Sequence, residues 1–402
     1  MQLEIPRKLK PLVEQAHLVA KEVFRPISRK YDRAEHEYPV ELDMLASVMD
    51  GMNEGDAGGG AGAAQLKQER AAKGGGVRNG TNMSTVLGLT ELCWGDVGLA
   101  LTIPRQGLGN AAIAAVANDE QSQRFKGRWA AMAITEPGAG SDSANIRTTA
   151  VRDGDHYVIN GEKIYITAGG RADIVVVWAS LDPSLGRAAI KSFVVEKGTP
   201  GMQLVRLDHK LGIRASDTAT ITFTDCRVPK ENLLGNPDID TKQGFGGVMQ
   251  TFDNTRPVVA AMALGVGRAS LERTRELLRQ RGILGGYERT LYGSTAAEAE
   301  LYRMEAELEG ARLLTLKAAW LADNGISNSK EASMAKAKAG RVANHITLRC
   351  LQLCAASGVT ETELLEKWAR DSKILDIFEG TQQIQLLIIA RRILGKSSAE
   401  LR

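Results

Sequence analysis

The sequence predicts an α+β protein in three blocks: an N-terminal helical domain (1–130), a small antiparallel β-barrel or sandwich domain (131–240) and a C-terminal four-helix bundle (241–402). Short β-branched segments gather in the middle block, whereas helical periodicity of apolar residues fills the blocks on either side. All 11 prolines of the 402-residue chain occur at or before Pro257. A long proline-free stretch rich in Ala, Leu, Glu, Lys and Arg favours packed helices.

The N-terminal block begins with apolar residues spaced three and four apart over residues 8–50, which predicts helices. Helical character returns from Met83 to Asn118. Between these stretches, residues 51–80 contain ten glycines and few apolar residues, so they predict a long mobile loop. A nucleotide-binding glycine fingerprint does not fit this segment, because no strand precedes the glycines and no apolar helix follows them.

The middle block changes to short segments of period two, such as those at 157–159, 174–178, 192–195 and 219–223. Turn signals separate them, among them Asn160-Gly161 and Thr199-Pro200-Gly201. Beyond residue 240 the pattern is helical again, and Pro257 is expected in the first turn of a helix that opens at Phe252.

Composition excludes several classes of function. A net charge of +3 gives no support for a nucleic-acid partner, and the longest apolar run (257–267) is far shorter than the roughly 20 residues that span a bilayer. The four cysteines are too sparse for a disulfide scaffold and lack zinc spacing with histidine, so we expect no metal site. The first residues have no apolar signal-peptide core, and we expect a cytoplasmic protein without a membrane span.

One carboxylate has a sequence context that suggests chemistry. Glu379 ends an apolar run, and Gly380 follows it. Desolvation raises the basicity of such a carboxylate, and glycine lets a ligand approach the backbone, so Glu379 is a candidate general base. The residues alone leave open a solvated glutamate at a helix end beside a glycine cap.

Three stretches together resemble signatures of the FAD-dependent acyl-CoA dehydrogenase family. They are Ile134–Asp142 (I-T-E-P-G-A-G-S-D), Tyr157–Gly170 (Y-V-I-N-G-E-K-I-Y-I-T-A-G-G) and Lys373–Gln385 (K-I-L-D-I-F-E-G-T-Q-Q-I-Q). They occur in the family's order and spacing, and the resemblance runs from about residue 20 to the C-terminus. It implies the same three-block fold and an FAD cofactor.

The resemblance also implies an activity. Glu379 would remove the α-proton of an acyl-CoA while the β-hydride passes to FAD, giving a trans-2-enoyl-CoA in a reaction of the fatty-acid β-oxidation type. The Glu379 main-chain N–H and a flavin ribityl hydroxyl would polarise the thioester carbonyl. Electrons would pass to electron-transferring flavoprotein, and the family's subunits form homodimers or homotetramers.

Further site residues are implied by the same likeness. On the cofactor, the resemblance implies Thr135 at the flavin ring, Ser141 at a phosphate, Thr167 at flavin N5, and Thr381 and Gln383 near the base. Tyr165 stands where members usually have a tryptophan beside the flavin, and tyrosine offers a smaller stacking face. On the substrate, it implies Gly380, Asp253 and Arg256, with Arg256 at the CoA adenine end. A solvated arginine at a helix start is the open alternative for Arg256.

Two of the family's FAD motifs are altered in this chain. The usual Arg-x-x-Phe-Gly is present only as Arg289 to Gly293 (R-T-L-Y-G), and Gln-x-x-Gly-Gly-x-Gly as Gln352 to Gly358 (Q-L-C-A-A-S-G). Arg289 and Gln352 would normally reach the FAD of a neighbouring subunit. The alanines at 355 and 356 add Cβ atoms where the backbone approaches a phosphate.

Two alternatives to the dehydrogenase therefore remain. One is an acyl-CoA oxidase relative that uses oxygen, and the other is a non-catalytic relative that keeps the fold as a binding scaffold. The altered FAD motifs and the glycine-rich segment favour a scaffold, whereas the intact Glu379-Gly380-Thr381 favours an enzyme. Acyl chain length cannot be deduced, because the segments that would line the acyl pocket are the divergent ones.

Overall fold

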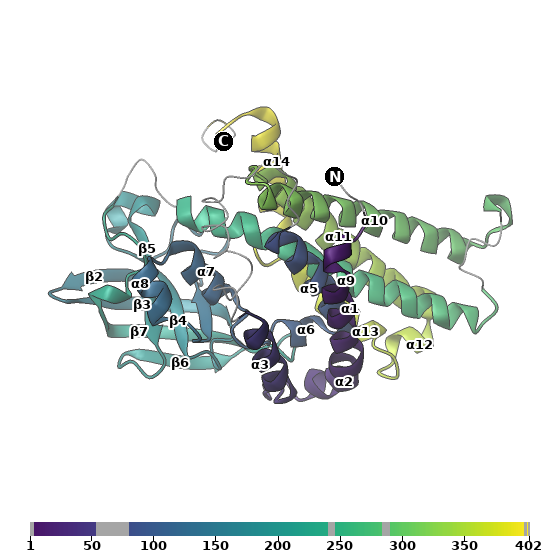
Figure 1. Ribbon diagram of the computed structural model, residues 1–402, viewed down its shortest axis with the longest axis horizontal. Coiled ribbons are helices and arrows are strands. Elements are labelled where there is room, and N and C mark those ends of the chain that lie inside the picture. Colours follow the sequence, from purple (N-terminus) through teal and green to yellow (C-terminus); the bar gives the residue numbers. More distant parts are fainter. Residues whose placement is uncertain (1–3, 54–79, 240–245, 284–289, 398–399, 401–402) are drawn as a thin grey trace.

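The computed structural model describes residues 4–53, 80–239, 246–283, 290–397 and 400. Helices occupy both ends of the chain and a curled sheet lies between them in sequence (Figure 1). The predicted fold class is confirmed. The division into domains at residues 130 and 240 remains a proposal.

The N-terminal part is helical, and its helix α5 (Thr81–Gly95) packs against the long helices of the C-terminal part. Its elements are α1 (Lys10–Val19), a π-helical turn (Ala20–Phe24), α2 (Arg25–Arg33), α3 (Glu41–Asn53), α5 (Thr81–Gly95), α6 (Val97–Ala100), α7 (Leu108–Val116) and α8 (Asp119–Arg124). The predicted glycine-rich loop at 51–80 begins too early, because residues 51–53 continue α3. Residues 54–79 lie outside the described part of the chain.

The start of α5 is fixed by a carboxylate from another helix. The side chain of Asp323 accepts hydrogen bonds from the main-chain N–H groups of Gly80, Asn82 and Met83, at 2.9–3.0 Å. These are N–H groups that a helix start leaves unsatisfied. Asp323 ends α10, so it ties α5 to the C-terminal helices.

The middle part is a seven-stranded sheet in the order β1-β4-β2-β3-β7-β6, with β5 paired to β4. The strands are β1 (Ala130–Ala133), β2 (Thr149–Asp153), β3 (His156–Thr167), β4 (Ile174–Ser180), β5 (Ile190–Glu196), β6 (Met202–Leu207) and β7 (Thr218–Pro229). Most pairs are antiparallel, as predicted. The prediction missed that β1 runs parallel to β4 and that β2 meets β4 in parallel at one residue pair.

Strand β3 contains a bulge at Tyr165. The register of β3 against β7 shifts between Lys163 and Ile166, and Tyr165 within this bulge has a left-handed φ of 58°. Bulges re-aim side chains out of the regular alternation. Tyr165 is 66% exposed.

In the C-terminal part the long helices α9 (Gly246–Arg279), α10 (Ala296–Asp323) and α11 (Ser329–Cys354) pack along one another, and α9 and α10 also pack along α5. The shorter helices are α12 (Ala356–Val359), α13 (Leu365–Ser372) and α14 (Gln382–Leu394). Gly265 lets α9 approach α5 closely, since a Cβ there would lie 2.4 Å from the carbonyl oxygen of Thr90. Pro257 lies inside α9, so the prediction of a helix start at Phe252 was wrong.

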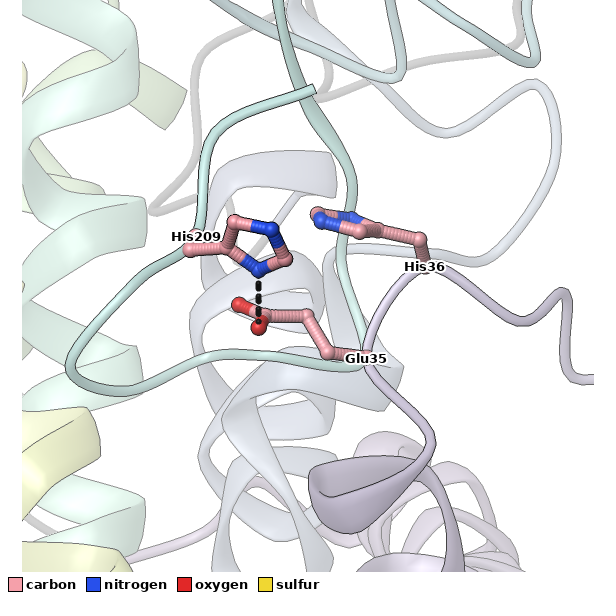
Figure 2. A group of neighbouring side chains, drawn as sticks. All are labelled: Glu35, His36 and His209. Atoms are coloured by element: carbon pink, nitrogen blue, oxygen red, sulfur yellow. Dashed lines mark hydrogen bonds and ion pairs between the residues drawn. The ribbon is translucent and has the colours of Figure 1, made fainter. Parts of the chain in front are cut away.

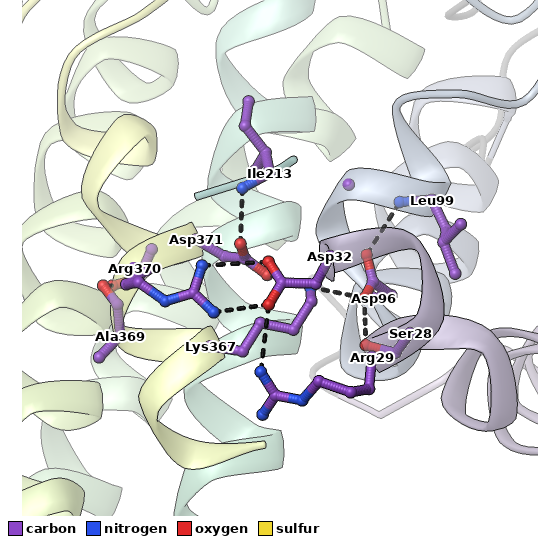
Figure 3. Close-up of polar contacts among 12 residues, drawn as sticks. Ser28, Arg29, Asp32, Asp96, Leu99, Ile213, Lys367, Ala369, Arg370 and Asp371 are labelled. Atoms are coloured by element: carbon purple, nitrogen blue, oxygen red, sulfur yellow. Dashed lines mark hydrogen bonds and ion pairs between the residues drawn. The ribbon is translucent and has the colours of Figure 1, made fainter. Parts of the chain in front are cut away.

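A buried network of charged side chains links α13, the helix that precedes the Glu379 segment, to two other regions of the chain (Figure 3). Lys367 of α13 donates to Asp96 at 2.6 Å and to Asp371 at 2.5 Å, and all three side chains are buried. Asp371 also accepts from the main-chain N–H of Ile213, in the loop that precedes β7, at 2.6 Å. Because Asp96 caps α6, the network fixes α13 against both the N-terminal helices and the sheet.

Candidate active site

Glu379 lies on a strained turn between two helices. The chain leaves the 3₁₀ helix Lys373–Asp376 and turns with φ of 55° at Glu379 and 89° at Gly380. The hydroxyl of Thr381 then caps α14 by accepting from the N–H of Ile384 at 3.4 Å. A left-handed φ is unfavourable for a residue with a Cβ, so surrounding contacts must hold Glu379 in place.

Two fully buried side chains supply those contacts. Lys336 of α11 donates to the carbonyl oxygen of Gly380 at 2.7 Å. Gln385 of α14 donates to the carbonyl oxygens of Glu379 and Gly380 at 3.0 and 3.1 Å. Burial lowers the pKa of Lys336 to about 8, although Asp376 and Glu379 oppose this shift. The turn is thereby fixed from two helices.

The Glu379 carboxyl group has the environment of a general base. Burial raises its pKa above the ordinary value, while the hydrogen bond from Thr255 and the charges of Arg256 and Lys336 partly counteract that rise. The Thr255 hydroxyl donates to Glu379 Oε2 at 2.8 Å. The Glu379 residue is half-buried and lines a cavity. A desolvated, oriented carboxylate facing a cavity is suited to accept a proton from a bound molecule.

The cavity has a volume of about 1160 Å³. Helices α1, α5 and α9, strands β1 and β3, and the Glu379 turn all contribute to its wall. One group of lining residues is apolar: Leu12, Val19, Leu89, Leu92, Leu101 and Met262. Such a surface suits an aliphatic chain, because binding removes the apolar groups of both the chain and the cavity wall from water.

A second group of lining residues carries hydroxyl groups. Of the residues predicted to bind FAD, Thr135, Ser141, Tyr165, Thr167 and Thr381 all line the cavity. Among the residues that the structure describes, no hydrogen-bond partner is found for the hydroxyls of Thr135, Ser141 and Thr167. Free hydroxyls can donate hydrogen bonds to the polar edge of a flat ring system, and an exposed aromatic ring on the same wall can stack against its face. The residues present therefore fit a flavin.

Other predicted residues do not lie on this cavity. Gln352 is exposed at the end of α11 and accepts a hydrogen bond from Arg349, and Gln383 is exposed on α14. The backbone of Asp253 is helical, but its side chain lies outside what the structure describes, as does all of Arg289. The roles of these four residues stay predictions.

Arg256 is buried and lies near Glu379. The residue is 3% exposed, so the alternative of a solvated arginine is wrong. Its charge is near enough to Glu379 to lower the pKa of that carboxyl. A contact with the adenine end of CoA stays a prediction.

The sequence analysis missed Lys336 and Gln385 and gave no role to the Thr255 hydroxyl. Lys336 lies in an alanine-rich helical stretch and resembles an ordinary surface lysine in sequence. Gln385 follows Glu379 closely, but Q-Q-I-Q does not show which of its glutamines is buried. Only the packing of α11 and α14 on the Glu379 turn identifies them.

The fold places a desolvated carboxylate between an apolar wall and a hydroxyl-bearing wall. Family models identify the class of this fold: residues 131–226 match the acyl-CoA dehydrogenase middle domain and residues 242–394 the acyl-CoA dehydrogenase C-terminal domain.

Similar proteins extend this result over nearly the whole chain. A short-chain specific acyl-CoA dehydrogenase of Clostridium acetobutylicum is 38% identical over 281 residues, or 68% of this chain and 72% of the relative. The "Probable medium-chain specific acyl-CoA dehydrogenase 2, mitochondrial" of Caenorhabditis briggsae is 36% identical over 94% of this chain and 88% of its own. The structure of butyryl-CoA dehydrogenase from Megasphaera elsdenii superposes with a TM-score of 0.84 at 30% identity, covering 98% of this chain and 100% of that one. The chain belongs to the acyl-CoA dehydrogenase family, a family of oxidoreductases.

Proposed function

We propose that this protein catalyses the FAD-dependent α,β-dehydrogenation of an acyl-CoA thioester to a trans-2-enoyl-CoA. The observation that carries the proposal is the Glu379 carboxylate, which is desolvated, held by Thr255 and turned toward the cavity. An α-proton beside a thioester is weakly acidic, so its removal needs both a base of raised pKa and stabilisation of the developing negative charge.

The chain's own groups supply both requirements. Glu379 would take the α-proton, and burial favours the protonated carboxyl that results. Within the described residues, the main-chain N–H of Glu379 has no hydrogen-bond partner, which leaves it available to a thioester oxygen. A fixed N–H aimed at a developing enolate stabilises it without reorganisation. Lys336 and Gln385 hold this N–H and the carboxylate on one rigid turn.

FAD is proposed as the cofactor, held by Thr135, Ser141, Thr167 and Thr381, with Tyr165 against the ring. When bound, FAD would supply the acceptor for the hydride that leaves the β-carbon. The proposed acyl chain is aliphatic and of short or medium length. The apolar wall and the chain specificities in the relatives' names support this range.

Partners are proposed on two grounds. Electron-transferring flavoprotein is the proposed electron acceptor, by likeness to the family. A homodimer or homotetramer is supported by α14, whose one buried residue among those described is Gln385, while Leu386, Leu387, Ile393 and Leu394 are 42–65% exposed. An apolar helix so exposed favours burial against another chain. No helix among the described residues combines the length and apolarity needed to cross a membrane, and the cytoplasmic location stays a prediction.

The test is the visible absorbance of the purified protein, recorded anaerobically before and after addition of acyl-CoAs of four to twelve carbons (about the short- to medium-chain range). We expect a flavin spectrum that bleaches with one chain class. Glu379→Gln should bind FAD and abolish the bleaching, because the amide cannot accept the proton, whereas the exposed Glu361→Gln should bleach as wild type does. A colourless protein that takes up no added FAD would refute the proposal and favour the scaffold. Oxygen consumption without an added acceptor would favour the oxidase.

A further inference from the structure

A group of three side chains with metal-binding chemistry lies away from the cavity. Glu35 and His36 follow α2, and His209 comes from the loop between β6 and β7 (Figure 2). Their nearest ligand atoms lie within 4.8 Å of one another. His209 Nδ1 is 2.9 Å from Glu35 Oε2, and the two imidazole rings are 5.1 Å apart at their centroids. The group therefore joins the N-terminal helices to the sheet.

His36 gives a second observation that points to a ligand at this group. Both of its ring nitrogens are shielded from solvent, and neither has a hydrogen-bond partner in the part of the chain that the structure describes. A shielded imidazole without partners is costly. Its backbone also has a left-handed φ of 74°, which a residue with a Cβ rarely adopts.

We propose that Glu35, His36 and His209 bind one Zn²⁺ ion or a chemically similar divalent transition metal. Two imidazole nitrogens with one carboxylate oxygen form a donor set that zinc accepts, with water completing the coordination. Zinc–ligand bonds of about 2.1 Å require ligand atoms about 3.4 Å apart in a tetrahedron. Small side-chain rotations would reach this spacing from the observed arrangement. Mg²⁺ and Ca²⁺ prefer oxygen ligands and fit this set poorly.

Positive groups around the site limit its affinity. Arg214 Nη2 lies 3.1 Å from Glu35 Oε2, and the main-chain N–H of Lys210 donates to Glu35 Oε1 at 2.8 Å. The guanidinium of Arg171 donates to the carbonyl oxygens of His36 and Glu37. Arg214 competes most directly with a metal, because it occupies the oxygen that faces His209. Its removal should therefore strengthen metal binding.

A bound ion would act as a clamp. The connection between α2 and α3 and the loop between β6 and β7 would share one metal, which stabilises the folded protein by binding only to it. This role is separate from the proposed dehydrogenation, since none of the three ligands lines the cavity.

The test is isothermal titration of the full-length protein with ZnCl₂ after treatment with a chelator. We expect one Zn²⁺ per chain and a melting temperature higher by about 2 °C or more at saturation. His209→Gln, at a largely exposed side chain, should weaken binding at least about tenfold, and His36→Gln should do the same. His345→Gln is the matched control, an exposed histidine beside a single carboxylate, and should bind as wild type does. Arg214→Met should bind several-fold more tightly.

Three results would overturn the proposal. The first is the absence of a one-to-one binding event with ZnCl₂. The second is binding that His36→Gln and His209→Gln leave unchanged, and the third is an equal loss in His345→Gln, which would indicate non-specific histidine binding. MgCl₂ should give no binding event, and one equal in strength to that of Zn²⁺ would contradict the assigned ligand chemistry.

Discussion

The Thr255 hydroxyl is the group whose removal most directly tests how Glu379 works. It donates one hydrogen bond of 2.8 Å to the carboxylate and thereby opposes the rise in pKa that burial causes. Thr255→Val keeps the shape and removes the donor. A hydrogen bond to a charged group contributes about 1.5–3 kcal/mol, and each 1.4 kcal/mol is a factor of about ten in the ionised fraction.

The expected result follows from the sign of this interaction. Without the donor the pKa of Glu379 rises further, so at a given acidic pH less of the base is ionised. The acid limb of the kcat/KM profile should move to higher pH, and kcat/KM on that limb should fall about tenfold, while the plateau at higher pH is retained. The assay is acyl-CoA-dependent reduction of a dye acceptor between pH 5 and 9. Thr255→Ser, which keeps a hydroxyl, is the control.

A limb that coincides with wild type, or that moves to lower pH, would refute this reasoning. Either result would mean that the hydroxyl does not favour the ionised carboxylate in the active protein. A drop of equal size at every pH would instead indicate misplacement of the substrate, and the circular dichroism spectrum of the variant would then be compared with wild type.

Three further changes test the packing that positions the site. Lys367→Met should lower the free energy of unfolding in urea by about 3–5 kcal/mol, because two carboxylates stay buried without their cation, whereas the exposed Lys126→Met should change it by less than about 0.5 kcal/mol. Gly340→Ala should cost about 1–3 kcal/mol and reduce turnover, since its Cβ would lie 2.7 Å from a backbone oxygen of the segment leading to Glu379. Gly310→Ala, with open space around it, should stabilise by up to about 1 kcal/mol. Ala355→Gly should stabilise by about 1 kcal/mol in a thermal melt, because φ of 49° and ψ of −127° suit glycine; a loss of stability would contradict that assignment.

The broad architecture was predictable because it depends on local periodicity. Strand and helix periods differ, so the change of pattern near residue 130 and again beyond residue 240 separates the three blocks. The parallel pairing of β1 with β4 was not predictable in this way. All four residues of Ala130–Ala133 are apolar and three of them are buried, so the sequence predicts a covered strand but does not determine which strand lies alongside.

The start of α9 shows a second limit of prediction from sequence. Proline is common in the first turn of a helix, so Pro257 suggested a start at Phe252. The helix instead begins at Gly246 and continues through the proline. Packing of α9 along α11 and α5 outweighs one lost hydrogen bond, and no local rule registers that contribution.

The proposed base could be picked out from the sequence, but the side chains that contact it could not. Glu379 stands in a recognisable motif, whereas its partners come from α9 and α11 through the fold. The predicted flavin contacts divide in a similar way. Thr135 and Thr167 lie in long motifs and line the cavity, whereas Gln352 is exposed away from it and could contact only the FAD of a second subunit.

Three fully buried lysines show why the electrostatics of this protein depend on contacts that are distant in sequence. Lys367 has two carboxylates in direct contact, and they raise its pKa despite complete burial. Lys163 has one, Glu136, and burial still lowers its pKa to about 8. Lys336 makes its hydrogen bond to a carbonyl oxygen, and its pKa is lowered to a similar value. The sequence around each lysine does not show how many carboxylates contact its side chain, and only the fold assigns that number.

The weakly compensated lysine is the one beside the proposed base, and this has a mechanistic consequence. The charge of Lys336 favours the ionised form of Glu379, and by reciprocity the Glu379 charge favours protonated Lys336. When Glu379 accepts a proton, Lys336 loses that support and its pKa falls further. Proton uptake by the base and the charge of Lys336 are therefore coupled across the Gly380 carbonyl that Lys336 holds.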